Sequence, residues 1–175
     1  MNSITYTYGY VLVLLLDRST CPIKIYTIGF KGKTAKNFFE TLKEHGIQKL
    51  IDVRRKNISQ LAGYAKGHDL KYFLQECFNI AYEHLPDFGP SNGLLEEYRN
   101  RLGKKKKDDA AWAFYVEQFN TTVLSMPLLE QFNGAVEDYQ RICLLCSEET
   151  AERCHRRLLA EHFKEKRSDI EIHHI

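Results

Sequence analysis

The sequence has no apolar segment long enough to cross a membrane. Its N-terminal part contains the apolar run Tyr10–Leu16, whereas a transmembrane helix needs about 20 such residues. The first basic residue is Arg18, so the run also lacks the positively charged segment that opens a secretory signal. We therefore expect a cytoplasmic protein with no membrane partner, in which residues 1–23 form an N-terminal extension or an extra edge strand.

The cysteine pattern of a small disulfide-stabilised domain is also missing. The chain has an odd number of cysteines, five in 175 residues, and a chain of this length folds without covalent crosslinks. Reduced thiols are therefore expected. Cys143 and Cys146 have the C-x-x-C spacing of zinc sites, but no second pair with this spacing follows. Their apolar surroundings predict a strand, which would direct the two thiols to opposite faces.

A strong excess of one charge is absent too. The formal net charge is +2, so the whole surface is not that of a strongly basic nucleic-acid-binding protein. The exception is local: four consecutive lysines at Lys104–Lys107 precede two aspartates. We interpret this run as a solvated loop, with a nucleic-acid or membrane contact as the alternative. Neither standard glycine-rich phosphate loop occurs, so no ordinary dinucleotide or P-loop site, and no cofactor, is expected.

What the sequence does contain is an alternation of short apolar strands and amphipathic helices. This order predicts an α/β fold: a single domain over residues 24–175, with a mostly parallel open sheet and helices on both faces, of the Rossmann-like kind. No internal repeat, low-complexity tract or linker interrupts it. The strands are expected at 24–29, 48–53, 80–85, 140–146 and 170–174, and the helices at 35–45, 69–78, 94–102, 110–119, 122–134 and 151–164.

Polar side chains gather where the predicted strands end. In an open parallel sheet, ligands bind beyond the carboxyl ends of the strands. The helix that begins near Ala151 presents free N–H groups and a positive dipole end to this edge. Together with arginine forks they predict a site for an anion such as phosphate or carboxylate. The alternative is an ordinary surface ion pair, such as Arg54 with Glu148. The residues expected to bind the ligand are Gly29, Asp52, Arg54, Arg55 and Arg156.

Cys146 is the candidate nucleophile, since a thiol at a helix N-terminus beside arginine has a lowered pKa. Glu148 or His155 would then carry the proton. Three simpler roles compete with these. Cys146 can be a small buried hydrophobic residue, Glu148 can pair with an arginine, and Asp52 can cap a turn or neutralise an arginine.

A metal site at these residues is not expected from the sequence. Cys146, Cys154 and His155 are zinc-type ligands, but adjacent residues on the predicted helix point about 100° apart. A fourth ligand is missing unless His84 or Glu148 supplies it. We therefore assign Cys154 to the core, because an apolar residue lies four positions further along the same helix face.

Four segments together resemble domain-of-unknown-function family 488. They are Tyr26–Gly29, Asp52–Arg54, His84–Pro86 with Gly89, and Leu144–Glu148 with Cys154–Arg156. The resemblance extends from about Lys24 to the C-terminus, and its closing Cys-x-Glu and Cys-His-Arg are its specific part. It implies a compact Rossmann-like α/β fold, and the family's name states that its activity is not established. The family's motif positions fall on Gly29, Asp52, Arg54, Cys146, Glu148, Cys154, His155 and Arg156.

The chain departs from the family pattern in two places. Phe30 and Lys31 stand where the family tends to have His-Ser, and Asn57 or Ile58 stands where it tends to have proline. The resulting hypothesis is a protein that binds, or binds and acts on, a phosphate-bearing ligand such as a nucleotide or nucleic acid. A thiol-dependent enzyme with Cys146 as nucleophile is one alternative. The other is a non-enzymatic interaction protein that uses the lysine run and the aromatic-rich segment Trp112–Phe119. The competing interpretation of that segment is that Trp112, Tyr115 and Phe119 form a helix face packed on the core.

Overall fold

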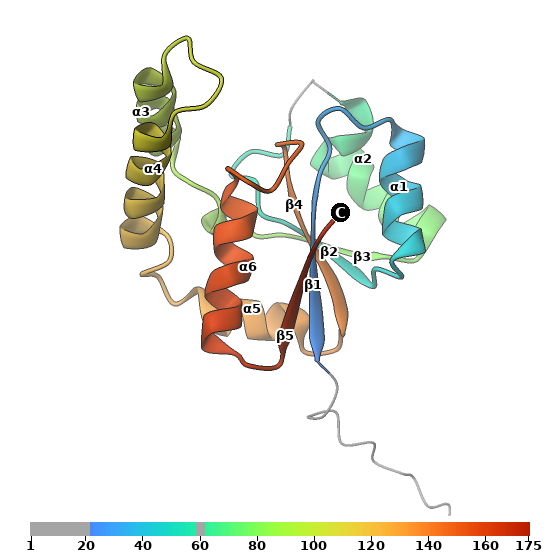
Figure 1. Cartoon of the computed structure of the whole chain (residues 1–175). Helices are drawn as coiled ribbons and strands as arrows, with labels where there is room; N and C mark the ends of the chain where they lie inside the picture. Colours follow the sequence, from blue (N-terminus) through green and yellow to red (C-terminus); the bar gives the residue numbers. More distant parts are fainter. Residues whose placement is uncertain (1–21, 59–61) are drawn as a thin grey trace, which may run out of the picture.

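Figure 1 shows a computed structural model that describes residues 22–58 and 62–175. Within these residues a five-stranded sheet has the order β3-β2-β4-β1-β5, and every strand pair in it is parallel. The predicted α/β fold is confirmed. The predicted N-terminal extension or edge strand lies outside the described residues, except that Ile23 already begins β1. The strands are β1 (Ile23–Gly29), β2 (Lys49–Asp52), β3 (Ala81–His84), β4 (Arg141–Cys146) and β5 (Ile170–His174).

Helices cover both faces of the sheet (Figure 1). Helices α1 (Ala35–Glu44) and α2 (Gly67–Tyr72) lie on one face, and α5 (Leu128–Val136) and α6 (His155–Lys166) on the other. Beyond them, α3 (Asn92–Leu102) and α4 (Asp109–Thr122) pack side by side. Because the central strands are buried on both faces, their alternating side chains supply two separate cores.

The connections that leave β2 and β4 diverge. After β2 the chain crosses with α2 to the edge strand β3, whereas after β4 it crosses with α6 over β1 to the opposite edge strand β5. Neighbouring strands whose connections separate in this way create a crevice at their carboxyl ends. The site described below lies at this switch point between β2 and β4.

Two helices begin later than predicted. Helix α5 starts at Leu128 rather than at 122, because Pro127 precedes it and α4 continues to Thr122. Helix α6 starts at His155 rather than at 151, and Cys154 is its N-cap with an extended backbone (φ −137°, ψ 139°). The segment 147–154 is therefore a loop. The predicted helix 69–78 begins at Gly67 as α2 and ends in a π-helical turn at Phe73–Cys77.

The aromatic-rich segment belongs to the core rather than to an exposed surface. Tyr115 and Phe119 are buried on α4, and the Trp112 ring stacks on Tyr115 at 5.1 Å between centroids. Tyr115 and Phe119 are therefore core residues, and Trp112 and Phe114 are partly buried against them. In the lysine run, Lys105 pairs with Asp108 and Lys107 with Glu152. Among the described residues, no helix is both long and apolar enough for a membrane span.

Candidate active site

The carboxyl ends of three neighbouring strands meet at one edge of the sheet. Cys146, the last residue of β4, lies opposite Gly29 at the end of β1, and Leu145 lies opposite Asp52 at the end of β2. Hydrogen bonds continue the β2–β4 pairing by one residue, from the Val53 N–H to the Leu145 carbonyl at 3.1 Å. The structure therefore brings these residues together at one edge of the sheet, as predicted.

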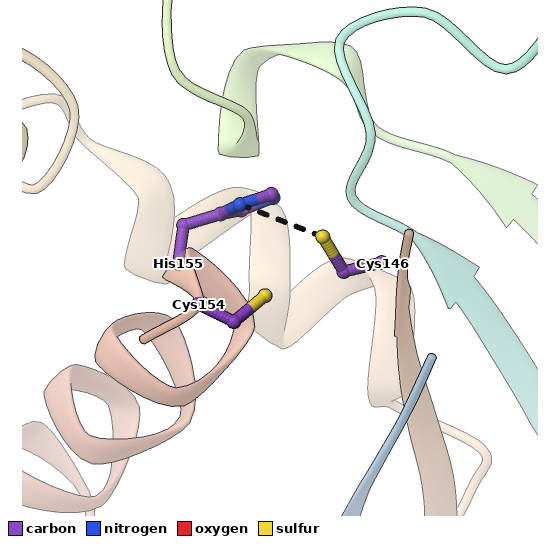
Figure 2. A group of neighbouring side chains, drawn as sticks. All are labelled: Cys146, Cys154 and His155. Carbon is purple, nitrogen blue, oxygen red and sulfur yellow. Dashed lines mark hydrogen bonds between the residues drawn. The ribbon is translucent and has the colours of Figure 1, made fainter. Parts of the chain in front are cut away.

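Cys146 and His155 form a buried thiol–imidazole pair (Figure 2). The Cys146 Sγ lies 3.6 Å from His155 Nδ1, and the Cys146 residue is only 4% exposed. The other ring nitrogen, Nε2, lies 3.1 Å from the Val53 carbonyl oxygen. Since a carbonyl only accepts, Nε2 carries a proton, and Nδ1 is left to exchange a proton with the thiol.

Cys154 completes a group of three donor atoms. Its Sγ, the Cys146 Sγ and a ring nitrogen of His155 all lie within 4.8 Å of one another, and Figure 2 shows the three side chains pointing toward a common centre. The expectation that Cys154 and His155 would diverge by 100° is wrong, because Cys154 precedes the helix and has an extended backbone. The assignment of Cys154 to the core alone is incomplete for the same reason.

The environment of the group favours the thiolate form of Cys146. A hydrogen bond from the Cys154 thiol holds the pKa of the Cys146 thiol well below its ordinary value against the effect of burial, and the charge of His155 and the Glu148 N–H add to this. Burial and the neighbouring Cys146 sulfur raise the pKa of Cys154. For His155, burial opposes the charged ring, but the Cys146 thiolate raises its pKa overall. Cys143 differs, since burial alone raises the pKa of its thiol.

Arg54 binds Asp52 in a fully buried ion pair. Its Nε and Nη2 atoms donate to the two carboxylate oxygens at 2.7 and 2.6 Å, and Nη2 also donates to the Ala65 carbonyl at 2.9 Å. The neutralising role considered for Asp52 is thus observed, whereas the alternative pair of Arg54 with Glu148 is not. Glu148 instead lies 3.6 Å from Lys31, with its side chain largely exposed.

The other predicted ligand-binding residues have structural partners. Arg55 donates to Asp87 at 3.1 Å and to the Gly89 carbonyl at 3.0 Å. Arg156, which is 1% exposed, donates to the carbonyls of Glu148 at 2.6 Å and Glu149 at 3.2 Å. Arg156 thus holds the loop that precedes α6, and Arg55 holds the turn after β3, so most of their guanidinium donors are engaged within the protein.

Gly29 is required by the same loop. A Cβ atom at this position would lie 1.7 Å from the Glu148 carbonyl oxygen. The glycine therefore allows the loop after β4 to approach the end of β1, which is a packing reason that needs no bound ligand.

Among the described residues, two buried nitrogens of the site's arginines, Arg54 Nη1 and Arg156 Nε, have no hydrogen-bond partner. Arg54 Nη1 is buried and makes no hydrogen bond, although its two companion nitrogens are fully engaged. A buried donor of this kind is a place where a ligand oxygen can bind.

Sequence reasoning missed two contributors. The Val53 carbonyl, which orients His155, has no side-chain signal by which it could be found. Tyr82 donates its hydroxyl to Asp52 at 2.9 Å, and burial followed by the Asp52 charge raises its pKa. The sequence could have indicated Tyr82, because it lies two residues before His84 and so faces the same side of the predicted strand.

Comparison with known proteins gives one match. The family model described as "Domain of unknown function DUF488" matches residues 34–163, which leaves the Tyr26–Gly29 segment outside the matched span. No curated protein matches the chain, and no solved structure does either. The matched span covers well over half of the chain, including the whole loop between Cys146 and Arg156. The chain therefore belongs to the DUF488 family of domains of unknown function.

Proposed function

We propose that the protein is a thiol-dependent enzyme in which Cys146 is the nucleophile and His155 carries the proton. The 3.6 Å contact between Cys146 Sγ and His155 Nδ1 is the observation that carries this proposal. It is supported by the Val53 carbonyl, which fixes the ring by binding Nε2. A nucleophile beside a base that a third group orients is the general arrangement of covalent catalysis.

The chemistry follows from these contacts. The Cys146 sulfur attacks an electrophilic atom of the substrate, and a bond from sulfur to that atom forms as the bond to the leaving group breaks. The leaving group departs with its electron pair and takes the proton that His155 received from the thiol. Because Cys146 is 4% exposed, the electrophile is a small molecule or a narrow group. Glu148 contributes its backbone N–H rather than its carboxylate, which lies on Lys31.

Alkylation of the full chain, treated with a chelator so that no metal ion covers the thiols, tests this proposal. Iodoacetamide at pH 7 should modify Cys146 at least tenfold faster than free cysteine, because more of its thiol is ionised. Peptide mass spectrometry identifies the modified residue. Cys146→Ser should remove the fast phase, whereas the matched control Cys143→Ser, at a buried thiol outside the group of Cys146, Cys154 and His155, should retain it. Labelling of Cys146 no faster than that of free cysteine contradicts the proposal.

A phosphate-bearing ligand, such as a nucleotide or a nucleic acid end, is the second candidate. It is supported by the unpartnered Arg54 Nη1 at the switch point, the position where ligands of such sheets bind. Against this, Asp52 already neutralises the guanidinium.

A thermal-unfolding screen at low salt tests this second candidate. A ligand present at 100 times its dissociation constant should stabilise the fold by about 2.7 kcal/mol. The shift should disappear in Arg54→Lys, which keeps a positive charge beside Asp52 but has no second terminal nitrogen. Equal shifts in wild type and Arg54→Lys, or none with phosphate, nucleotides or oligonucleotides, contradict it.

A further inference from the structure

We infer that Cys146, Cys154 and His155 form a three-ligand site for a soft divalent cation, with zinc the best match, and leave the fourth coordination position open. Two thiolates and an imidazole are a typical zinc donor set. In tetrahedral zinc, bond lengths of about 2.3 Å to sulfur and 2.0 Å to nitrogen place neighbouring donor atoms roughly 3.5–3.8 Å apart. The observed 3.6 Å between Cys146 Sγ and His155 Nδ1 is such an edge, and all three donors lie within 4.8 Å.

The groups around the donors also suit a metal. A metal-binding histidine usually donates its second ring N–H to a carbonyl or carboxylate, and His155 does so to the Val53 carbonyl at 3.1 Å. Each sulfur receives a further hydrogen bond: Cys146 from the Glu148 N–H, and Cys154 from Arg156 Nη1 at 3.4 Å. These bonds orient the sulfurs and would stabilise the two thiolates that a bound divalent cation requires.

Burial favours a cation over a bulky ligand. Cys146, Cys154 and His155 are all buried, so the donors are sheltered from water by the ends of β2 and β4 and the start of α6. The two residues considered as a fourth ligand are engaged elsewhere. His84 Nε2 lies 2.8 Å from the Arg54 carbonyl, and Glu148 pairs with Lys31. Three protein ligands with one open position are the arrangement of catalytic rather than structural zinc sites.

This site does not depend on the proposed function, because it requires only the donor geometry. The two are connected in one respect: a bound cation engages the Cys146 sulfur and would slow its alkylation.

Cobalt and zinc binding to the chelator-stripped, reduced full chain tests the inference. One equivalent of Co²⁺ should produce a near-ultraviolet thiolate-to-metal charge-transfer band and visible bands of tetrahedral coordination, and one equivalent of Zn²⁺ should abolish both. Cys154→Ser and His155→Gln should each weaken binding at least about tenfold. The matched controls Cys143→Ser and Cys77→Ser should bind like wild type, since neither residue belongs to the group.

Protection of Cys146 from alkylation by bound metal supplies a second readout. It uses the wild-type chain, so it does not depend on whether a variant folds. Stoichiometric Zn²⁺ should slow iodoacetamide modification of Cys146 at least tenfold, while modification of Cys77 stays unchanged. Absence of the cobalt bands together with absence of protection overturns the inference, and so do bands that persist unchanged in Cys154→Ser. Fast alkylation of the stripped chain without metal binding would retain the proposed function alone. Metal binding with slow alkylation of the stripped chain would retain only the metal site.

Discussion

At the scale of single residues, the site is defined by which atoms a side chain reaches, and this is where sequence reasoning was least complete. Cys146 and His155 could be placed together because one ends a strand and the other opens the following helix. Cys154 could not be placed with them. The predicted helix began about one turn too early, so Cys154 was expected inside the helix rather than at its N-cap. The partner of Arg54 could not be predicted either, because Asp52 and Glu148 are both expected at this edge and only the side-chain geometry shows that Arg54 binds Asp52.

The pH dependence of Cys146 alkylation follows from its environment. A hydrogen bond from Cys154 and the charge of His155 hold the pKa of the Cys146 thiol well below its ordinary value. Free cysteine, with a pKa of about 8.5, loses roughly tenfold in reactivity for each pH unit below that value. Cys146 should lose much less than tenfold between pH 8 and pH 7, because its thiol is still ionised. Rates of iodoacetamide modification in the chelator-treated chain measure this.

Two variants separate the causes of that profile. Cys154→Ala removes the hydrogen bond to the Cys146 sulfur, and His155→Gln removes the neighbouring positive charge. Each should move the midpoint of the rate profile to higher pH, because the thiolate loses a stabilising partner. A profile that follows free cysteine in the wild type, or that stays unchanged in both variants, contradicts this assignment.

At the scale of elements, the sequence pattern located all five strands of the described residues, whereas the ends of the helices depend on tertiary contacts that the sequence does not show. Phe38, Phe39 and Leu42 recur at helical spacing in the sequence and are buried on α1, and Thr34 caps that helix. The start of α6 is set differently. Arg156 reaches back from the first turn of that helix and binds the carbonyls of Glu148 and Glu149, which keeps 147–154 out of the helix.

Removing this arginine should therefore destabilise the fold. Arg156→Gln would leave the two loop carbonyls with fewer donors inside the protein, and hydrogen bonds from charged groups contribute about 1.5–3 kcal/mol each. We expect a loss of about 2–4 kcal/mol in the free energy of unfolding, measured by urea denaturation. Lys36→Gln is the control, because its pair with Glu40 is exposed and should contribute at most about 0.5 kcal/mol. Equal stability of Arg156→Gln and wild type would contradict this account of the loop.

At the scale of the whole molecule, the fold class was predictable and the strand order was not. Alternating strands and helices imply a parallel sheet, and the continuous apolar run at β4 implies a central strand buried on both faces. That β4 lies between β2 and β1 depends on pairings between residues about 90 to 120 positions apart, such as Lys49 with Ile142. The switch point follows from that order, which is why the sequence predicted an edge of the sheet but not the crevice within it.

The Asp52–Arg54 pair joins three parts of the molecule at this switch point. Asp52 ends β2 and accepts from Tyr82 of β3, while Arg54 donates to the Ala65 carbonyl before α2. Both charges are buried, so removing one partner leaves the other uncompensated at a cost of about 3–5 kcal/mol. We expect Asp52→Asn and Arg54→Met each to lose this much, as measured by urea denaturation. Tyr82→Phe, which removes the bond donated to Asp52 and the bond accepted from Asn57, should lose about 2 kcal/mol.

The double variant is the decisive measurement of this pair. When Asp52→Asn and Arg54→Met are combined, no buried charge is left without a partner, so the loss should be clearly smaller than the sum of the two single losses. A coupling of several kcal/mol would show that the cost of each single change is the stranded charge rather than the missing contact. Additive losses would mean that the two side chains stabilise the ends of β2 and β3 independently, through Tyr82 on one side and the Ala65 carbonyl on the other. In that case the switch point would be held by hydrogen bonds to its neighbours and not by the ion pair at its centre.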